Sequence, residues 1–331
     1  MHRWNALSDI PADLQGAAVT LGNFDGVHRG HRAVLAELTA RGAALGVPTV
    51  AVTFDPHPLA VLRPHQAPAL VGTLDQRVAL LSSMGLDAVF VMEFTRELAT
   101  WTPEQFVERV FVDALHARVV VVGQDTRFGV RNSGDTATLR ELGDRHGFEV
   151  VVVHDQGDPG DGAEPERWSS SQVRRLVIEG DVAAARRVLG REHEVAGVVV
   201  HGDHRGRELG YPTANLCQDP DGLIPADGVY AGWLVAADEP DAPLPAAISI
   251  GTNPTFDGTQ RRVEAYVLDR SDLDLYGRRV ALRFVARLRP TYKFSGIEEL
   301  LEVMAGDVRH TREVLGLPAS PHPPSPRRTA E

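Results

Sequence analysis

The chain has 331 residues, of which 43% are hydrophobic and 24% charged, so it is long and apolar enough for two globular domains. Its formal net charge of −11 argues against a general nucleic-acid or anionic-membrane surface, because both need a basic face. The single cysteine, Cys217, excludes an intrachain disulfide, and the first residues contain no apolar signal segment. No run approaches the length of a membrane span, so we expect a soluble, cytoplasmic protein without nucleic-acid or membrane partners.

The first half of the chain alternates short apolar runs with amphipathic segments, which predicts a parallel sheet with crossover helices. Continuous runs of valine are typical of strands that are covered on both faces. We therefore expect a Rossmann-like α/β domain over residues 1–187. The expected strands are Ala17–Leu21, Thr49–Phe54, Ala88–Met92, Val119–Val122 and Glu149–Val153, and the expected helices are His31–Leu45, Leu74–Met84, Pro103–Ala114 and Thr136–His146.

The second half of the chain has a different pattern, in which short alternating segments are separated by turns rich in glycine, proline and aspartate. Regularly spaced short strands without intervening helices predict an antiparallel barrel or sandwich over residues 188–317. One helix, from about Gly296 to Leu315, would close this domain, and residues 318–331 should be a disordered tail. The expected strands are Glu194–His201, Gly228–Ala236, Ala246–Ile250, Arg261–Asp269 and Arg278–Arg287.

The most informative motif is GNFDGVHRGH, which spans residues 22–31, where the first apolar run gives way to a helical pattern. A strand that turns through Gly26 into a helix directs the first free N–H groups of the helix at the turn, and such a helix terminus attracts phosphate. His28 and His31 lie three residues apart and could add hydrogen-bond donors on the same face. This arrangement is typical of nucleotidyl transfer. The alternatives are histidines that cap the helix, or two ligands of a zinc site with His57 as the third.

Two common phosphate-binding motifs are missing from the chain. Its one lysine, Lys293, does not lie in a P-loop, and the one Gly-x-Gly, at Gly160 and Gly162, is not followed by the dinucleotide-binding pattern. Phosphates must therefore be bound by histidine, arginine, hydroxyl groups and backbone N–H groups.

Two further segments of the first half could bind a nucleotide. In the Trp168–Arg174 segment, Ser170 and Ser171 precede a helix, so they are either N-caps or, with Arg174, part of a site for an anion. Asp125 and Arg127 follow a strand, where side chains commonly face a ligand crevice. They could recognise a base or ribose, or they could lie in a surface turn.

The second half contains a block from Gly202 to Asn215 in which a glycine-spaced loop carries two arginines. Backbone N–H groups of such a loop can wrap a polyphosphate, and the alternative is an arginine-rich hairpin loop. Thr213 and Asn215 alternate along an extended segment, so both point to one side, and their oxygens suit Mg²⁺ held with ATP phosphates.

Glu264 lies within an apolar strand of the second half. An inward carboxylate there would be costly to bury without a task or a partner, which makes Glu264 a candidate general base for activating a hydroxyl. A surface glutamate on an edge strand is the alternative.

Taken together, these motifs resemble those of the bifunctional bacterial riboflavin kinase/FMN adenylyltransferases, also called prokaryotic FAD synthetases. The resemblance runs from about Gly16 to Leu315, with the motifs in the order that the family has. They are GNFDGVHRGH, Val121–Gly129, Ser169–Arg174, Pro212–Asn215, Gly251–Phe256, Glu264, Asp274–Gly277, Phe284, Leu288–Pro290 and Lys293–Phe294.

For the N-terminal half, the resemblance implies a nucleotidyltransferase domain in which the FMN phosphate attacks the α-phosphate of ATP, and FAD and pyrophosphate leave. His28 and His31 would stabilise the transition state, and Asp125 and Arg127 would contribute to flavin or nucleotide recognition. The flavins would be substrates and products, so no tightly bound prosthetic group is required, and the oligomeric state stays open. Phosphates would be bound by Gly22, Asn23, Phe24, Gly26, Ser170, Ser171 and Arg174.

For the C-terminal half, the resemblance implies a riboflavin-kinase β-barrel in which the riboflavin 5′-hydroxyl attacks the γ-phosphate of MgATP to give FMN and ADP. Glu264 would be the catalytic base, Thr213 and Asn215 would organise Mg²⁺ and phosphates, and Asn253 would contribute to flavin or nucleotide recognition. The nucleotide would be covered by Gly202, Arg205, Gly206, Arg207, Gly210 and Pro212.

Two other functions compete with this hypothesis. Another H-x-G-H nucleotidyltransferase, acting on phosphopantetheine or a polyol phosphate, would fit the first half but would not need the groups of a kinase barrel at Thr213, Asn215 and Glu264. A flavin-binding regulator without activity would be expected to have lost polar groups such as His28 and His31, yet they are present.

Overall fold

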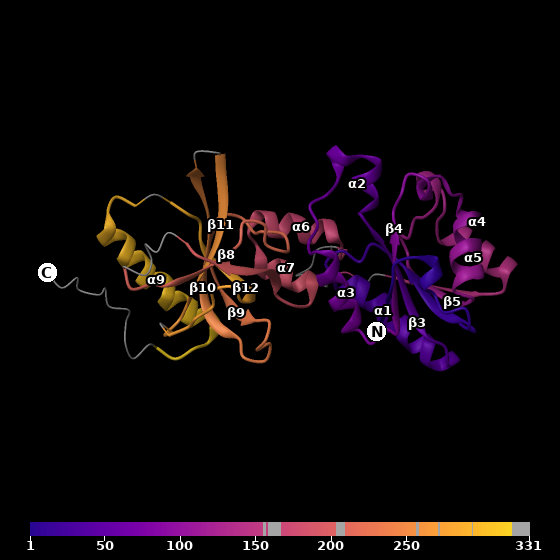
Figure 1. The fold of residues 1–331 in the computed structure, drawn as a ribbon, viewed down its shortest axis with the longest axis horizontal. Helices are drawn as coiled ribbons and strands as arrows, with labels where there is room; N and C mark the ends of the chain where they lie inside the picture. The colour runs from indigo at the N-terminus through magenta and orange to yellow at the C-terminus, as the bar shows by residue number, and fades with distance from the viewer. Residues whose placement is uncertain are drawn as a thin grey trace. The chain divides into compact units, whose positions relative to one another are not determined.

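We describe the chain from a computed structural model. The structure describes residues 1–154, 157, 167–202, 209–255, 258–270, 272–292 and 294–319, and only the backbone of residues 253–255 and 258–260. The chain divides into two compact units, 1–170 and 171–331, which can be followed by colour in Figure 1. Helices α6 (Ser170–Glu179) and α7 (Val182–Leu189) thus fall almost wholly in the second unit. The extents of the functional domains, 1–187 and 188–317, stay predictions, and most of the expected tail lies outside the described residues.

The first unit contains a parallel sheet of six strands in the order β1-β4-β3-β2-β5-β6. The predicted α/β architecture is confirmed, with five of the six strands placed by their apolar runs. The sixth strand, β1, has only three residues, which is too short to show a hydrophobic period. The strands are β1 His2–Trp4, β2 Ala17–Leu21, β3 Thr49–Asp55, β4 Ala88–Glu93, β5 Ala117–Gly123 and β6 Glu149–Val153.

Helices cover both faces of this sheet. Successive side chains of β2, such as Ala18 and Val19, enter the cores on opposite faces of the sheet, as the period of two in a strand requires. Helices α1 and α3 lie on one side of the sheet, and α4 and α5 lie on the other (Figure 1). The predicted helix Pro103–Ala114 begins as α4 and widens into a π-helical segment, η4. The helices are α1 Arg29–Leu45, α2 Pro58–Leu62, α3 Leu74–Ser82, α4 Pro103–Phe106, η4 Val107–Ala114 and α5 Thr136–His146, with 3-10 turns at Leu7–Asp9, Pro64–Gln66, Leu98–Thr100 and Val130–Asn132.

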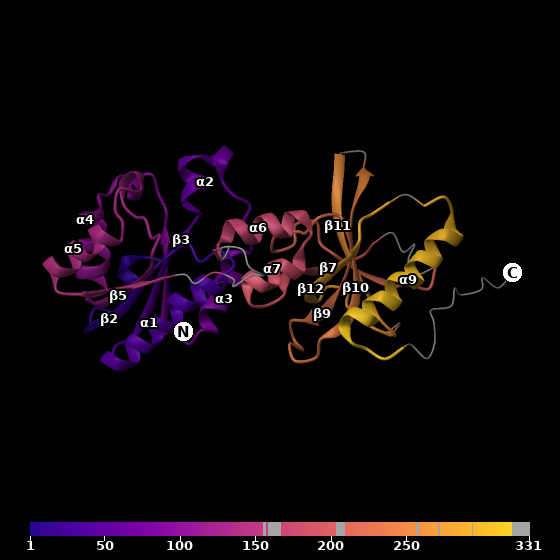
Figure 2. The same cartoon turned by 180° about the vertical axis from the view of Figure 1, so that it is seen from behind.

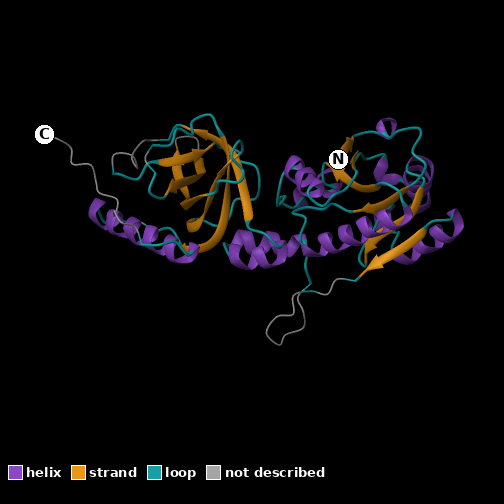
Figure 3. Cartoon of the chain, turned by 90° about the horizontal axis from the view of Figure 1, so that it is seen from below, coloured by secondary structure: helices purple, strands orange, loops and turns teal. Residues whose placement is uncertain are grey.

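The described part of the second unit forms a closed antiparallel barrel in the order β10-β11-β8-β7-β12-β9, which confirms the barrel prediction. Helix α9 (Ile297–Leu315) packs along the outside of the barrel, as Figures 2 and 3 show. Throughout the described residues, every helix is too short or too polar to cross a bilayer. The strands are β7 His193–Val200, β8 Thr213–Leu216, β9 Gly228–Ala236, β10 Leu244–Thr255, β11 Gly258–Val267 and β12 Arg279–Arg289.

The turn between α6 and α7 closes one end of this barrel. Val182 is fully buried in the same cluster as the barrel's interior side chains. A Cβ at Gly180, whose φ is +85°, would lie 2.9 Å from the hydroxyl oxygen of Tyr230, so a larger residue would not fit there. The Tyr230 hydroxyl in turn donates a 2.5 Å hydrogen bond to the carbonyl of Ala226.

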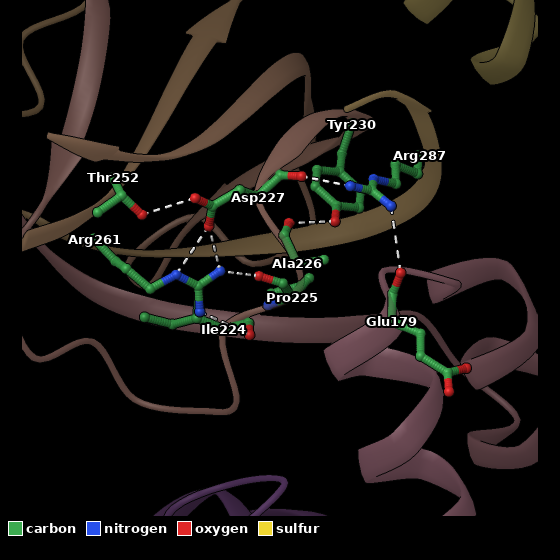
Figure 4. Close-up of polar contacts among 9 residues, drawn as sticks. All are labelled: Glu179, Ile224, Pro225, Ala226, Asp227, Tyr230, Thr252, Arg261 and Arg287. Atoms are coloured by element: carbon green, nitrogen blue, oxygen red, sulfur yellow. Dashed lines mark hydrogen bonds and ion pairs between the residues drawn. The ribbon is translucent and has the colours of Figure 1, made fainter. Parts of the chain in front are cut away.

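A polar network beside this turn holds the same end of the barrel together (Figure 4). The carboxylate of Asp227 accepts hydrogen bonds from Arg261, at 2.8 and 3.0 Å, and from the Thr252 hydroxyl at 2.7 Å. Arg261 and Thr252 are directly opposite each other on β11 and β10, so Asp227 links both strands to the segment before β9. Arg287 donates to the carbonyl oxygens of Asp227 and of Glu179, at the end of α6.

Candidate active sites

The strand order of the first unit places two of the predicted motifs side by side. Strands β2 and β5 are neighbours, but the chain runs from β2 to β3 on one side and from β5 to β6 on the other. Open parallel sheets bind ligands outside the carboxyl ends of their strands at such a switch point. The turn that follows β2, residues 22–31, and the loop that follows β5, residues 124–129, therefore share the edge where a ligand is expected.

The turn after β2 has an unusual backbone. Gly26 has a φ of +76°, and the bulky residues Phe24 and Val27 also have positive φ, at +49° and +38°. Such conformations cost about 1–3 kcal/mol each for residues other than glycine, and they persist only where the surroundings fix them. Phe24 and Val27 are each 2% exposed, so their packing supplies part of that constraint. A Cβ at Gly22 would lie 3.0 Å from the Phe24 ring, which explains a glycine there.

His28 is the N-cap of helix α1. Its Nδ1 accepts a hydrogen bond of 3.4 Å from the backbone N–H of His31, so the proton of a neutral ring is on Nε2. Nε2 can then donate to a ligand at the helix terminus. The capping interpretation and the phosphate-binding interpretation of His28 are thus compatible, because they use different nitrogens of one ring.

The ring of His31 stacks on His28, with 3.7 Å between ring centroids, and meets the edge of Phe24 at 5.2 Å. Burial of the ring, followed by the nearby charges of His28 and Arg77, holds the pKa of His31 well below its usual value. His31 is therefore neutral at physiological pH. Because His31 is neutral, the stacked pair does not carry two positive charges, and its ring N–H groups can still donate to a phosphate.

Other predicted residues of the first unit make contacts of their own. Ser170 donates a 2.8 Å hydrogen bond to the carbonyl of Asp25, so it touches the turn that carries the histidines. Asn23 is exposed on the same turn. Arg174 donates to the hydroxyl of Ser171 at 3.4 Å. Residues 22–31, which we call the histidine turn, contain the predicted phosphate-binding residues Gly22, Asn23, Phe24 and Gly26, and Ser170 lies directly against this turn.

The two residues predicted to recognise flavin or nucleotide are both in ion pairs. Arg127 lies 3.2 Å from Asp135, which caps α5 by accepting from the backbone of Thr138. Asp125 pairs with Arg167. All four of these charged side chains are about half exposed, so the pairs can exchange for a ligand at small cost.

The zinc alternative gains no support from the described residues. Within them, no group of three histidine, cysteine, aspartate or glutamate side chains gathers as a metal site. His57, the third ligand considered, caps α2 by accepting a 3.2 Å hydrogen bond from the N–H of Leu59.

The second site lies on the barrel, where β8 and β11 pair. Glu264 is opposite Asn215 and Tyr266 is opposite Thr213 in this antiparallel ladder. The hydroxyl of Thr213 donates to a carboxylate oxygen of Glu264 at 3.4 Å, and the Asn215 amide donates to both the carbonyl and the hydroxyl of Thr213 at 3.2 Å. The structure therefore brings the three predicted residues together.

The direction in which Glu264 points differs from the inward one considered from the sequence. Its neighbours Val263 and Ala265 fill the barrel core, so Glu264 is on the outer face and half-buried. Ala214 is likewise in the core, which places Thr213 and Asn215 on the outer face beside Glu264. The carboxylate is next to hydroxyl and amide groups instead of being enclosed by apolar side chains.

Gly202 packs tightly against Asn215 of this trio. A Cβ on Gly202 would lie 2.6 Å from the amide nitrogen of Asn215, so only glycine leaves room for the amide. Gly210, with a φ of +86°, and Pro212 lead into β8. The remaining predicted loop residues, Arg205, Gly206 and Arg207, lie outside the described residues, as does the side chain of Asn253.

Known proteins match both units. The FAD synthetase family model matches residues 10–164, and the riboflavin kinase model matches residues 189–315. A bifunctional riboflavin kinase/FMN adenylyltransferase from Escherichia coli K12 is 35% identical over 306 residues, which are 92% of this chain and 95% of that protein. Its counterpart from Pseudomonas fluorescens is 37% identical over 313 residues, 94% of this chain and 97% of that protein. The chain belongs to this bifunctional family.

One solved structure has the same fold as this chain. It is a Streptococcus pneumoniae protein described as a macrolide-efflux protein, and it is 28% identical with a TM-score of 0.81. The match covers 94% of this chain and 98% of that one.

Sequence reasoning missed one buried charged residue beside the histidine turn of this family member. Arg77 of α3 is 3% exposed and donates to the carbonyl of Phe54 at 2.9 Å. The sequence does contain a sign of this residue, because position 77 lies in the same helical stripe as Leu74 and Leu81, where an apolar residue would be expected. A charged side chain at such a position needs partners, and the sequence did not show which they are.

Proposed function

We propose that this chain makes FAD from riboflavin in two ATP-dependent transfers, with kinase chemistry on the barrel of the second unit and adenylyl transfer at the histidine turn of the first. Membership of the bifunctional family supports the pair of reactions. The observation that carries the proposal is that each unit holds its own set of reactive groups: the stacked pair His28 and His31 at a helix terminus, and the trio Thr213, Asn215 and Glu264 on the barrel.

In the kinase step, the 5′-hydroxyl oxygen of riboflavin attacks the γ-phosphorus of ATP, and the bond from that phosphorus to the bridging oxygen breaks to release ADP. Glu264 accepts the hydroxyl proton as general base. Its position on the outer face leaves the carboxylate accessible to a substrate, and the Thr213 hydroxyl at 3.4 Å orients it.

The residues of the barrel site fit a magnesium ion that arrives with ATP. Mg²⁺ prefers oxygen ligands and usually keeps phosphate oxygens and waters. Nδ2 of Asn215 makes the hydrogen bonds to Thr213, so Oδ1 of Asn215 and Oγ1 of Thr213 are the oxygens that would hold the ion. The ion supplies charge neutralisation for the phosphates, and Gly202 leaves space for the amide in this position.

In the adenylyl step, an oxygen of the FMN phosphate attacks the α-phosphorus of ATP, and the bond between the α-phosphorus and the bridging oxygen breaks to release pyrophosphate. The attacking oxygen is already ionised, so no base is needed. His28 and His31, the latter as a neutral ring, donate hydrogen bonds to the oxygens that gain charge, together with the N-terminus of α1.

The remaining predicted roles belong to this proposal. Asp125 and Arg127 contribute to flavin or nucleotide recognition after their ion pairs open, and Asn253 does so in the barrel unit. Ser170, Ser171 and Arg174 bind phosphates in the first site. The enzyme acts in the cytoplasm, and its flavins are substrates and products.

The test is chromatography of flavins after the protein is incubated with riboflavin, ATP and Mg²⁺. We expect FMN to appear first and FAD afterwards. FMN without FAD would contradict the assignment of the first unit, and unchanged riboflavin from a folded sample would contradict the kinase assignment.

A further inference from the structure

The residues just before helix α3 are hydrogen-bonded to the strained histidine turn. The carboxylate of Asp25, in the middle of the turn, accepts hydrogen bonds from the backbone N–H of Val71 at 3.0 and 3.1 Å and from that of Gly72 at 3.4 Å. These two residues directly precede Thr73, the N-cap of α3. The position of the turn is therefore tied to the start of this helix.

A second connection runs from α3 to Asn23, near the start of the turn. Nη1 of Arg77 donates to the hydroxyl of Thr53 at 3.1 Å as well as to the carbonyl of Phe54. The Thr53 hydroxyl donates in turn to the carbonyl of Asn23 at 3.2 Å. Arg77 therefore fixes the backbone of Asn23 through one intermediate side chain, from a helix that begins about fifty residues later in the chain.

Packing alone does not require a charged residue at position 77. Burial lowers the pKa of the Arg77 guanidinium, and the nearby charges of Asp25 and Asp55 offset only part of this effect. Nε of Arg77 has no hydrogen-bond partner among the described residues. An apolar side chain of similar volume would fill this position without the cost of burying a charge. The arginine therefore points to a task other than filling the core.

We propose that Arg77 is a positioning residue for adenylyl transfer, which holds the histidine turn in its reactive shape through Thr53 and keeps a positive charge beneath the phosphate site. The inference rests on the proposed adenylyl transfer. A misplacement of about 1 Å in a reacting group can lower a rate by up to about 100-fold, and a turn with two positive-φ bulky residues relaxes when its outside contacts are removed.

The role has two parts, holding the shape of the turn and supplying a positive charge, and three variants of the full-length chain separate them. Arg77→Lys keeps the charge but loses the planar fork of donors. Thr53→Val leaves Arg77 in place and removes the link to Asn23. Arg77→Gln removes the charge. Each variant is assayed for kcat and KM in FAD formation from FMN and MgATP, for the pKa of His31 by NMR of labelled histidine, and for thermal unfolding and FMN formation from riboflavin.

We expect all three variants to lower kcat for FAD formation about 10- to 100-fold with little change in KM. The charges that act on His31 come from His28 and Arg77, so only Arg77→Gln should raise its pKa. FMN formation from riboflavin should stay as in the wild type. Wild-type protein that makes no FAD would overturn the proposed function itself. If the wild type is active and Thr53→Val and Arg77→Lys keep its kcat, the positioning role is overturned. Variants that lose stability but keep the wild-type kcat would overturn it as well.

Discussion

The two sites are built in opposite ways. The first is a turn of irregular backbone at the carboxyl end of a parallel strand, with positive φ at Phe24 and Val27 and contacts to residues far along the chain. The second is a patch of regular antiparallel ladder, where register alone places Glu264 opposite Asn215. The first site therefore depends on distant supporting residues, whereas the second depends on strand pairing. Substitutions in the two units should reveal this difference.

The largest separation of the two reactions is expected from Glu264→Gln. An amide cannot take the proton of the riboflavin hydroxyl, so FMN formation should fall by about 10² to 10⁴. Supplied FMN should still be converted to FAD at the wild-type rate, which flavin chromatography measures. If the folded variant lost both reactions, the assignment of one reaction to each unit would be wrong.

The reciprocal change is His28→Ala. Loss of one preorganised donor to the transferred phosphate should lower FAD formation by about 10² to 10³, and the N-cap of α1 is lost as well. FMN should accumulate from riboflavin. His28→Asn, which can still cap the helix, serves as the control for that structural loss, and full recovery of FAD formation in it would show that capping alone is the role of His28.

A smaller effect is expected from Gly202→Ala. The added Cβ would lie 2.6 Å from the Asn215 amide, so the amide has to move. We expect kcat/KM for riboflavin phosphorylation to fall about tenfold, with adenylyl transfer unchanged. Gly306→Ala is the matched control, because its Cβ would have no neighbour nearer than 3.7 Å. Equal kinetics in the two variants would argue against the placement of Asn215 in the site.

The smallest effect concerns pH and the stability of the first unit. His31 has a lowered pKa in the folded state, so the unfolded chain binds its proton first as the pH falls below about 6.5. The free energy of unfolding should therefore decrease with falling pH in that window, by at most about 1.4 kcal/mol per pH unit.

Urea unfolding of the wild type and of His31→Asn at several pH values measures this slope. The variant should lose that part of the pH dependence. His65→Asn, at an exposed histidine, should keep it. A wild-type slope no steeper than that of His31→Asn would mean that His31 is not held neutral by the fold.

The sequence was a good guide wherever a local period decides the structure. Continuous valine runs placed the central strands, and the alternation of Thr213 and Asn215 correctly put both on one side of β8. The same alternation in Val263, Glu264 and Ala265 indicates an outward carboxylate, although the apolar composition of the strand drew attention to the inward option. The three residues of β1 gave no period at all.

Contacts between distant segments were beyond this kind of reasoning. Arg77, Thr53 and Asn23 are connected by hydrogen bonds across 24 and 30 residues of chain, and nothing in their spacing states which side chains meet at the sheet edge. The same holds for the network around Asp227, which joins Arg261 from 34 residues away. Topology makes these contacts, and the sequence shows only that the polar groups need partners.

The closure of the barrel between β9 and β10 has a consequence for association. Where a barrel strand is paired on both sides, its N–H and C=O groups offer no template to a strand from another molecule. In the described part of the first unit, β1 and β6 each have one side without a strand neighbour. Of these two edges, strand-to-strand aggregation during refolding should therefore begin at β6, because β1 is too short to recruit a partner.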